Sequence, residues 1–234
     1  MATLAAHSSY VLSVAFHPTA PLLATGSGDK TVKLWLLSSD NSSATCVATL
    51  AAHSGYVYSV AFHPTLPLLA TGSSDNTAKL WELAPDNLSA DCVATLEGHR
   101  GWVYSVVFHP TAPLLATGSD DGTVKLWRRS SNYKSVTCVA TLEKNDEAEN
   151  FNNPILSVAF HPTAPLLAAG SASPNDNTVN LWDFEQITQF IQEQRQKEAM
   201  LANRKALCGI YYEIGVLTGF GEGLRPNNSP KHHR

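Results

Sequence analysis

The chain has 234 residues, enough to bury a sizeable core without disulfides or metals. Its formal net charge is −4 and only 15% of its residues are charged, which argues against a basic nucleic-acid-binding surface or a polybasic membrane anchor. The opening residues MATLAAHSS lack the charged and apolar regions of a secretory signal, and the longest apolar stretch, 207–220, contains Glu213. We therefore expect no nucleic acid and no membrane as a partner, and a cytoplasmic location with the nucleus as the alternative.

From its start the chain repeats one unit with a period of 46 residues. In the second copy, four short runs rich in Val, Thr, Tyr, Phe and Leu follow one another: CVATL, YVYSVAF, LLATGS and TAKLWEL. The breaks between them are HPTLP, SSDN and a loop rich in Ser, Asn and Asp, all turn-forming. Helical periodicity is absent before residue 184. We predict an all-β fold of four-stranded antiparallel units that cover one another, since one unit cannot bury both faces of its sheet.

The unit His…Ser-Val-Ala-Phe-His-Pro…Leu-Leu-Ala-Thr-Gly-Ser-x-Asp-x-Thr-Val-Lys-Leu-Trp resembles the WD repeat of β-propeller proteins over residues 1–183. The resemblance implies four four-stranded blades in a partial or two-chain ring. The repeats are about 1–45, 46–91, 92–137 and 138–183. It also implies the usual role of that family, a noncatalytic scaffold that binds other proteins.

The resemblance assigns the recurring His, Thr, Asp and Trp to a hydrogen-bonded tetrad within each blade. The sets are His7, Thr25, Asp29, Trp35; His53, Thr71, Asp75, Trp81; and His99, Thr117, Asp121, Trp127. A hydrolase triad is the alternative interpretation, but an active site needs one copy, not three. Seven of nine histidines occupy repeat positions, and the other two lie in a polar tail. We expect no catalytic residue, no metal site and no cofactor.

The fourth copy departs from the others. Six residues are inserted before His161, within the acidic, Asn-rich segment 143–154, and Ala169 stands where the other copies have Thr. Two tetrad members are missing, which leaves Asp176 and Trp182. We expect a softer blade with a protruding 143–154 loop, caused either by relaxed selection on a terminal blade or by a partner-specific contact.

Aromatic residues follow each histidine loop, where the resemblance places the top rim of the ring and its docked partners. Exposed aromatic rings with a polar tip are good contact anchors. The predicted partner-binding residues are Tyr10, Tyr56, Trp102, Arg100, Tyr58 and Tyr104. For Tyr58 and Tyr104, packing within the blade is an equal alternative. The chain could instead be the regulatory or substrate-recruiting part of a larger enzyme or complex, or a truncated propeller fragment without its own function.

Residues 1–5 align with residues 47–51, which predicts the outer strand that completes the last blade. Four blades leave one joint open and expose strand edges. Three outcomes follow: two chains form an eight-blade homodimer ring, the C-terminal segment covers the open face, or the chain is a fragment stable only with a partner.

Two further expectations concern cysteines and the C-terminal segment. Cys46, Cys92 and Cys138 recur at equal spacing and are predicted to be small buried hydrophobic residues, not disulfide partners. Residues 184–220 are predicted to form a helical extension that either caps a blade edge or docks a partner, and 221–234 a disordered tail.

Overall fold

The computed structural model describes residues 3–5, 7–143, 153–172 and 178–183. The chain divides into two compact units, Met1–Ile187 and Thr188–Arg234, and all described residues belong to the first. The predicted helical extension and tail lie outside the described residues, as do Asp176 and residues 144–152 of the inserted loop.

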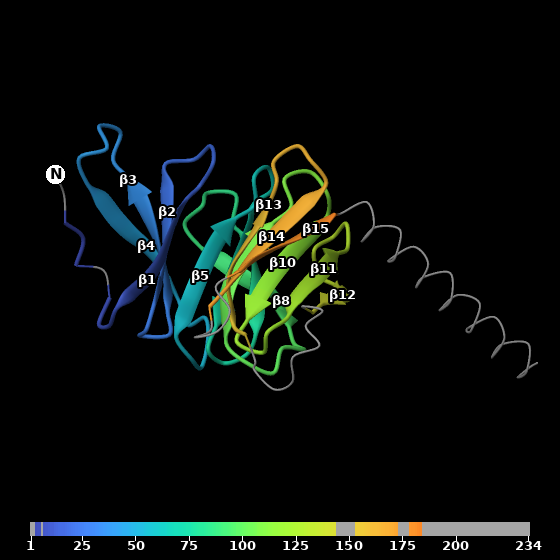
Figure 1. Cartoon of the computed structure of the whole chain (residues 1–234). Helices are drawn as coiled ribbons and strands as arrows, with labels where there is room; N and C mark the ends of the chain where they lie inside the picture. The colour runs from blue at the N-terminus through green and yellow to red at the C-terminus, as the bar shows by residue number, and fades with distance from the viewer. Residues whose placement is uncertain (1–2, 6, 144–152, 173–177, 184–234) are drawn as a thin grey trace, which may run out of the picture. The chain divides into compact units, whose positions relative to one another are not determined.

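Fifteen strands form four antiparallel sheets in the described part of the chain, and each sheet follows chain order (Figure 1). We call these sheets blades 1 to 4. Blade 1 contains β1 (Val11–Phe16), β2 (Leu22–Ser27), β3 (Val32–Leu37) and β4 (Ala44–Leu50). Blade 2 contains β5 (Val57–Phe62), β6 (Leu68–Ser73), β7 (Ala78–Leu83) and β8 (Ala90–Leu96). Blade 3 contains β9 (Val103–Phe108), β10 (Leu114–Ser119), β11 (Val124–Arg129) and β12 (Val136–Leu142). Blade 4 contains β13 (Ile155–Phe160), β14 (Leu166–Ser171) and β15 (Val179–Asp183). The predicted all-β class of antiparallel blades is confirmed.

The number of strands differs from the prediction in blade 4. Blades 1 to 3 have four strands each, whereas blade 4 has three in the described residues. Residues 1–5 were expected to complete a blade, yet Thr3–Ala5 forms no strand. A strand needs a neighbour to pair with. Thr3–Ala5 precedes β1 of blade 1, whereas β15, the edge strand of blade 4 in the described residues, lies at the other end of the row of blades.

The turn between the second and third strands has the same shape in blades 1 to 3. Its third residue has positive φ: 73° at Lys30, 68° at Asn76 and 78° at Gly122. Asn and Gly adopt this left-handed conformation readily, whereas it is uncommon for Lys. The turn matters because the residue before each of these is the tetrad aspartate, whose carboxylate the turn directs toward the histidine loop.

The hydrophobic core lies between neighbouring blades. We define the trailing face of blade 1 by Leu22, Ala24, Val32 and Leu34, and the leading face of blade 2 by Val57, Val60, Leu69 and Trp81. These two faces form one buried cluster. The equivalent faces of blades 2 and 3 form a second cluster. Burying each Leu or Val contributes roughly 1.5–3 kcal/mol, so a blade obtains much of its stability from the next blade.

The predicted burial of the repeated cysteines is wrong. Cys46, Cys92 and Cys138 are free thiols and exposed. They lie on the outermost strands β4, β8 and β12, where side chains alternate between the two faces of the sheet. The conserved spacing reveals that the three positions are equivalent, but it does not show which face they occupy.

Candidate functional site

The four residues of the first tetrad form one continuous chain of hydrogen bonds. The indole N–H of Trp35 donates to Thr25 Oγ1 at 3.0 Å. Thr25 Oγ1 lies 2.7 Å from His7 Nε2, and His7 Nδ1 lies 2.8 Å from Asp29 Oδ2. The chain therefore links a turn, a loop and two strands, and it gives each buried polar group a partner.

Blades 2 and 3 repeat this geometry closely. The Trp81–Thr71, Thr71–His53 and His53–Asp75 distances are 3.0, 2.8 and 2.8 Å. The corresponding distances among Trp127, Thr117, His99 and Asp121 are 2.8, 2.6 and 2.8 Å. The histidine side chains are fully buried in all three sets. Both ring nitrogens are thus occupied and covered, which leaves none free to act as a general base on a substrate.

The aspartate of each tetrad is held by more partners than the sequence analysis identified. Thr31 donates to Asp29 Oδ1 through both its hydroxyl (2.6 Å) and its backbone N–H (3.1 Å), and the Ser8 N–H donates to Oδ2. Burial alone would raise the pKa of Asp29, but the hydrogen bonds from Thr31, His7 and Ser8 outweigh it and lower that pKa well below its usual range. A threonine two residues after each aspartate repeats every 46 residues, so the signal was available in the sequence.

Blade 4 lacks this network among its described residues. Ala169 is buried at the position of the tetrad threonine and offers no hydroxyl. Trp182 is only partly buried on β15, whereas its three counterparts are buried. The remaining candidate, Asp176, lies outside the described residues.

Histidines of the His-Pro turns play a second structural role that the sequence analysis did not assign. The Nδ1 atom of His63 accepts backbone N–H bonds from Thr65 and Leu66, both at 3.1 Å. His17, His109 and His161 do the same in their own turns. Burial, with a smaller effect of the nearby Arg129 charge, lowers the pKa of His63 to about 4. The turn of His63 therefore holds a neutral imidazole as a hydrogen-bond acceptor.

Four of the predicted rim residues form an aromatic cluster, which we call the rim cluster: Tyr56, Tyr58, Trp102 and Tyr104. Tyr58 stacks on Trp102 with 5.9 Å between ring centroids, and its ring lies 5.0 Å from that of Tyr104. Tyr56 contacts Tyr58 at 6.4 Å, and Trp102 contacts Tyr104 edge to face at 6.2 Å. The cluster spans blades 2 and 3, because β5 and β9 pack together.

The rim cluster is anchored to the turns that carry the tetrad aspartates. The Trp102 carbonyl accepts the Asp120 N–H at 2.8 Å, and the Tyr56 carbonyl accepts the Ser74 N–H at 2.9 Å. The Tyr104 hydroxyl donates to Asp120 Oδ1 at 3.2 Å. Burial, the Asp120 charge and this hydrogen bond raise the pKa of Tyr104 to about 12. Asp120 thus places a carboxylate beside the cluster, and the sequence analysis missed it because blades 1 and 2 have Gly28 and Ser74 there.

Tyr10 and Arg100, the other two predicted rim residues, lie apart from this cluster. Tyr10 is 78% exposed and makes no ring contact with any described residue. Arg100 is exposed, and its backbone N–H donates to Asp121 Oδ2 at 2.8 Å. The structure therefore brings together four of the six predicted rim residues.

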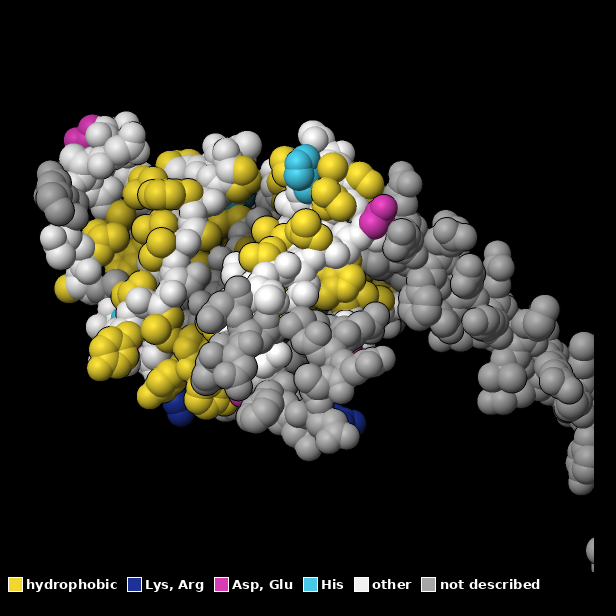
Figure 2. Space-filling model, in the orientation of Figure 1, with side chains coloured by type: hydrophobic (Ala, Val, Ile, Leu, Met, Phe, Trp, Pro, Cys, Tyr) yellow, Lys and Arg dark blue, Asp and Glu magenta, His cyan; other side chains and the backbone are white. Residues whose placement is uncertain are grey.

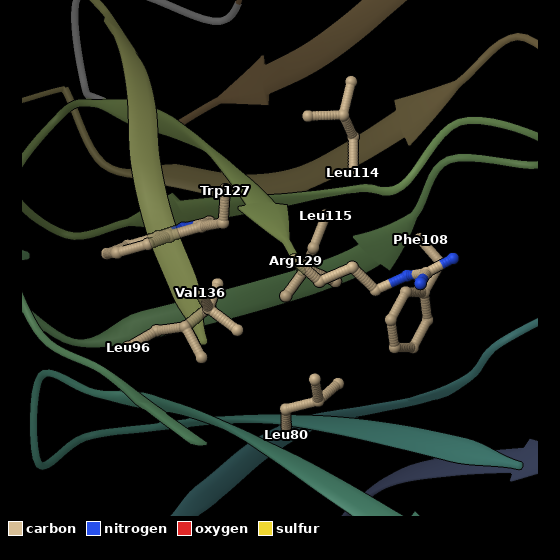
Figure 3. A pocket seen from close by; sticks show the side chains of 8 residues that line it. All are labelled: Leu80, Leu96, Phe108, Leu114, Leu115, Trp127, Arg129 and Val136. Carbon is tan, nitrogen blue, oxygen red and sulfur yellow. The ribbon is translucent and has the colours of Figure 1, made fainter. Parts of the chain in front are cut away.

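The cavity between blades 2 and 3 offers no room for a ligand. Leu80, Leu96, Phe108, Trp127 and other apolar side chains line it, with Arg129 as the polar member (Figure 3). Its volume is about 10 Å³, enough for one water molecule at most. In the described parts of the chain, we also find no group of three or more His, Cys, Asp or Glu that could hold a metal ion. Nor does any helix there have the length and apolar character needed to cross a membrane.

Repeated antiparallel blades, joined face to face and locked in blades 1 to 3 by a His–Thr–Asp–Trp network, define a β-blade repeat protein. The family model "WD domain, G-beta repeat" matches residues 1–35, 44–82, 90–128 and 136–183. The chain belongs to this family. WD-repeat proteins are typically noncatalytic and generally mediate protein–protein interaction or scaffolding.

Proposed function

We propose that this chain is a noncatalytic interaction scaffold whose rim cluster binds a partner protein. The main support is an aromatic surface that the fold holds in place but does not bury. Trp102 remains 46% exposed although Tyr58 and Tyr104 support its ring from below and beside it. An ordered, exposed Trp among tyrosines has the composition of a binding hot spot, since little side-chain freedom is lost on binding.

The chemistry of the rim cluster favours a partner side chain that is flat, apolar or cationic. Aromatic faces attract such groups, and the Asp120 carboxylate adds a negative charge beside them. Self-association is a second kind of protein contact within this proposal, and it uses other surfaces of the blades. Neither kind of contact needs a catalytic residue. This agrees with the tetrad histidines, whose two ring nitrogens are already hydrogen-bonded.

We propose a cytoplasmic or nuclear location for the scaffold. The support is the presence of three exposed free cysteines, Cys46, Cys92 and Cys138, which persist as thiols in a reducing compartment. Microscopy of a fluorescent fusion checks this, and accumulation in a secretory compartment would contradict it.

The scaffold proposal is tested by quantitative affinity capture with the wild type, Trp102→Ala and a matched control, Leu88→Ala. Leu88 is an exposed residue on the outer loop of blade 2, away from the rim cluster. Removing a hot-spot Trp costs about 2 kcal/mol of binding energy, roughly a thirtyfold loss of affinity. We expect a set of proteins that the wild type and Leu88→Ala retain and Trp102→Ala loses.

The three proteins should have the same thermal midpoint, so that folding does not explain the difference. Equal capture by Trp102→Ala and the wild type would contradict the proposed role of the rim cluster.

A further inference from the structure

Successive blades are joined in the same way at all three contacts: blade 1 with blade 2, blade 2 with blade 3, and blade 3 with blade 4. At each joint, a backbone N–H of the following blade donates to a serine hydroxyl of the preceding blade. The donor and acceptor pairs are Val60 N and Ser13 Oγ (3.1 Å), Val106 N and Ser59 Oγ (3.1 Å), and Val158 N and Ser105 Oγ (3.2 Å). All six residues lie on the first strands of their blades, so these bonds set a common spacing.

A glycine of the preceding blade lets side chains of the following blade approach its backbone. A Cβ atom at Gly26 would lie 2.8 Å from Val57 Cγ1 and 3.0 Å from Val60 Cγ1. The same test gives 2.9 Å at Gly72 and 2.6 Å at Gly118, again against the following blade. The joint therefore requires glycine on one face and branched side chains on the other.

A histidine and a phenylalanine complete each joint. The ring pairs are His17 and Phe62 at 5.0 Å, His63 and Phe108 at 4.9 Å, and His109 and Phe160 at 4.8 Å. Each pair has edge-to-face geometry. Serine, glycine and histidine thus belong to the trailing side of a joint, and valine, phenylalanine and a backbone N–H to the leading side.

The leading side of blade 1 carries its half of a joint with no blade against it in the described residues. Val14 is 62% exposed, whereas Val60 and Val106 at the equivalent positions are 5% and 4% exposed. Val11 and Phe16 are also exposed. Figure 2 shows hydrophobic side chains gathered on the surface over β1 to β4 and again over β13 to β15.

The trailing side of blade 4 carries the other half. A Cβ atom at Gly170 would meet nothing within 4 Å in the described structure, unlike its three counterparts. Ser157, the counterpart of Ser13, is exposed. Leu181 is 68% exposed, although Leu34 at the equivalent position is fully buried. Each unjoined face therefore has the residues that its counterpart needs.

The edge of blade 4 shows the same complementarity. In blade 1, Val32 pairs with Leu50 and Lys33 with Thr49. The sequence around Thr3 and Leu4 matches that of β4, and β15 has no fourth strand beside it in the described residues. Moreover, Asn180 Nδ2 on β15 is buried with no hydrogen-bond partner there.

We propose that a second copy of this chain fills both gaps, so that two copies join head to tail in a closed ring of eight blades. The leading face of blade 1 in one copy packs on the trailing face of blade 4 in the other. Val14 N–H of the second copy donates to Ser157 Oγ, its Val11 and Val14 side chains cover Gly170, and its Phe16 ring lies against His161.

The same assembly supplies the missing strand of blade 4. Thr3–Ala5 of the second copy pairs with β15, with Leu4 opposite Val179 and Thr3 opposite Asn180. Asn180 Nδ2 then donates to the Thr3 hydroxyl of the second copy, as Lys125 Nζ donates to Thr141 Oγ1 across β11 and β12 at 2.9 Å. This pairing gives the orphaned amide a partner and removes an open strand edge.

A second copy fits better than an unrelated protein, because the two unjoined faces are the two halves of a joint that the chain already forms three times. A head-to-tail contact leaves one face open at each end of any unclosed assembly. Two copies are the smallest assembly that covers every face. This ring goes beyond the proposed rim function, and it does not involve Trp102.

The test is the solution mass of the full chain by light scattering coupled to size exclusion. Variants are Val14→Asp on the leading face, Gly170→Val on the trailing face, and the control Leu88→Asp on an outer loop. We expect about twice 25.2 kDa for the wild type and Leu88→Asp. Val14→Asp and Gly170→Val should each give the monomer mass, because each blocks one side of both joints.

Circular dichroism shows whether the variants stay folded; Gly170→Val should, since its side chain enters open space within one copy. A monomeric wild type would overturn the proposal and favour a face covered by the chain's own C-terminal segment. A dimer broken by only one of the two variants would overturn the head-to-tail contact, and masses above two copies would overturn ring closure. Trp102→Ala should keep the dimer mass, so failure of the rim proposal and of the ring are distinguishable.

Discussion

At the residue scale, the chain uses histidine in two ways, in which the ring nitrogen Nδ1 plays opposite hydrogen-bonding roles. In the tetrads, Nδ1 faces an aspartate and Nε2 faces a threonine hydroxyl, as for His53 with Asp75 and Thr71. In the His-Pro turns, Nδ1 instead accepts two backbone N–H groups, as in His63. The partner of each nitrogen, not the residue type, therefore decides what protonation would do.

We predict that stability falls as the pH is lowered from about 6.5 toward 4, through His63. Its folded pKa of about 4 lies below the unfolded value of 6.5, so the unfolded chain binds the proton more tightly. The contribution is fully present above pH 6.5 and is lost progressively down to pH 4, by about 3 kcal/mol in total. Denaturant titrations at several pH values measure this loss.

The matched variant for that experiment is His63→Asn. An Asn oxygen can accept the same two backbone N–H groups but does not titrate. We expect a flatter dependence of the unfolding free energy on pH in this window, whatever the absolute stability. An unchanged slope would contradict the assignment. Below pH 4 both proteins should lose further stability, because the lowered pKa values of Asp29 and Asp121 make these carboxylates resist protonation only in the fold.

At the element scale, close contact between blades depends on glycine. A Cβ atom at Gly118 would lie 2.6 Å from Ile155 Cγ2, so Gly118→Ala forces blades 3 and 4 apart. Overpacking of this kind typically costs about 1–3 kcal/mol. We expect a lower free energy of unfolding by urea for Gly118→Ala than for its parent.

Gly170→Ala is the control for that substitution, because it adds the same methyl group where the described structure has open space. Both changes are made in the Val14→Asp background, so that self-association does not contribute. The control should match its parent or exceed its stability by roughly 0.5–1 kcal/mol, because Gly within a strand is less favourable than Ala by about that amount. Equal effects at Gly118 and Gly170 would contradict the role of glycine in the joint.

The sequence predicts the strands and turns well because the chain repeats the same pattern of residues in four copies. Strand composition, His-Pro turns and the Asp-containing turn all recur every 46 residues, and the structure forms four blades from them. The tetrad hydrogen bonds could be anticipated only through the family resemblance, since spacing alone does not show which atoms meet.

Other features depend on neighbouring blades and could not be derived from one repeat. The exposure of Cys46 follows from the face that β4 turns outward. The rim cluster forms because Tyr58 of blade 2 reaches Trp102 of blade 3, a contact between repeats. Thr3–Ala5 likewise forms no strand, because no strand lies beside it in the described residues.

At the scale of the whole molecule, the repeats separate the residues that stabilise the blades from the residues of the proposed binding surface. Tetrads recur in blades 1 to 3 and stabilise each of these blades, and the joints hold blades 1 to 4 in series. The rim cluster uses aromatic residues and Asp120, which vary from blade to blade, on top of this frame. The residues of the rim cluster can therefore change without a change in the fold beneath them.

The measurement that tests this account most directly is the free energy of unfolding of Asp75→Ala in urea, beside that of Asp91→Ala. Asp91 is an exposed aspartate on β8 of the same blade. Removing Asp75 leaves Nδ1 of the buried His53 without its carboxylate partner, which costs roughly 1–3 kcal/mol. We predict a loss of that size for Asp75→Ala and almost none for Asp91→Ala. Equal stability of Asp75→Ala and the wild type would show that the tetrad does not stabilise its blade and would contradict the account.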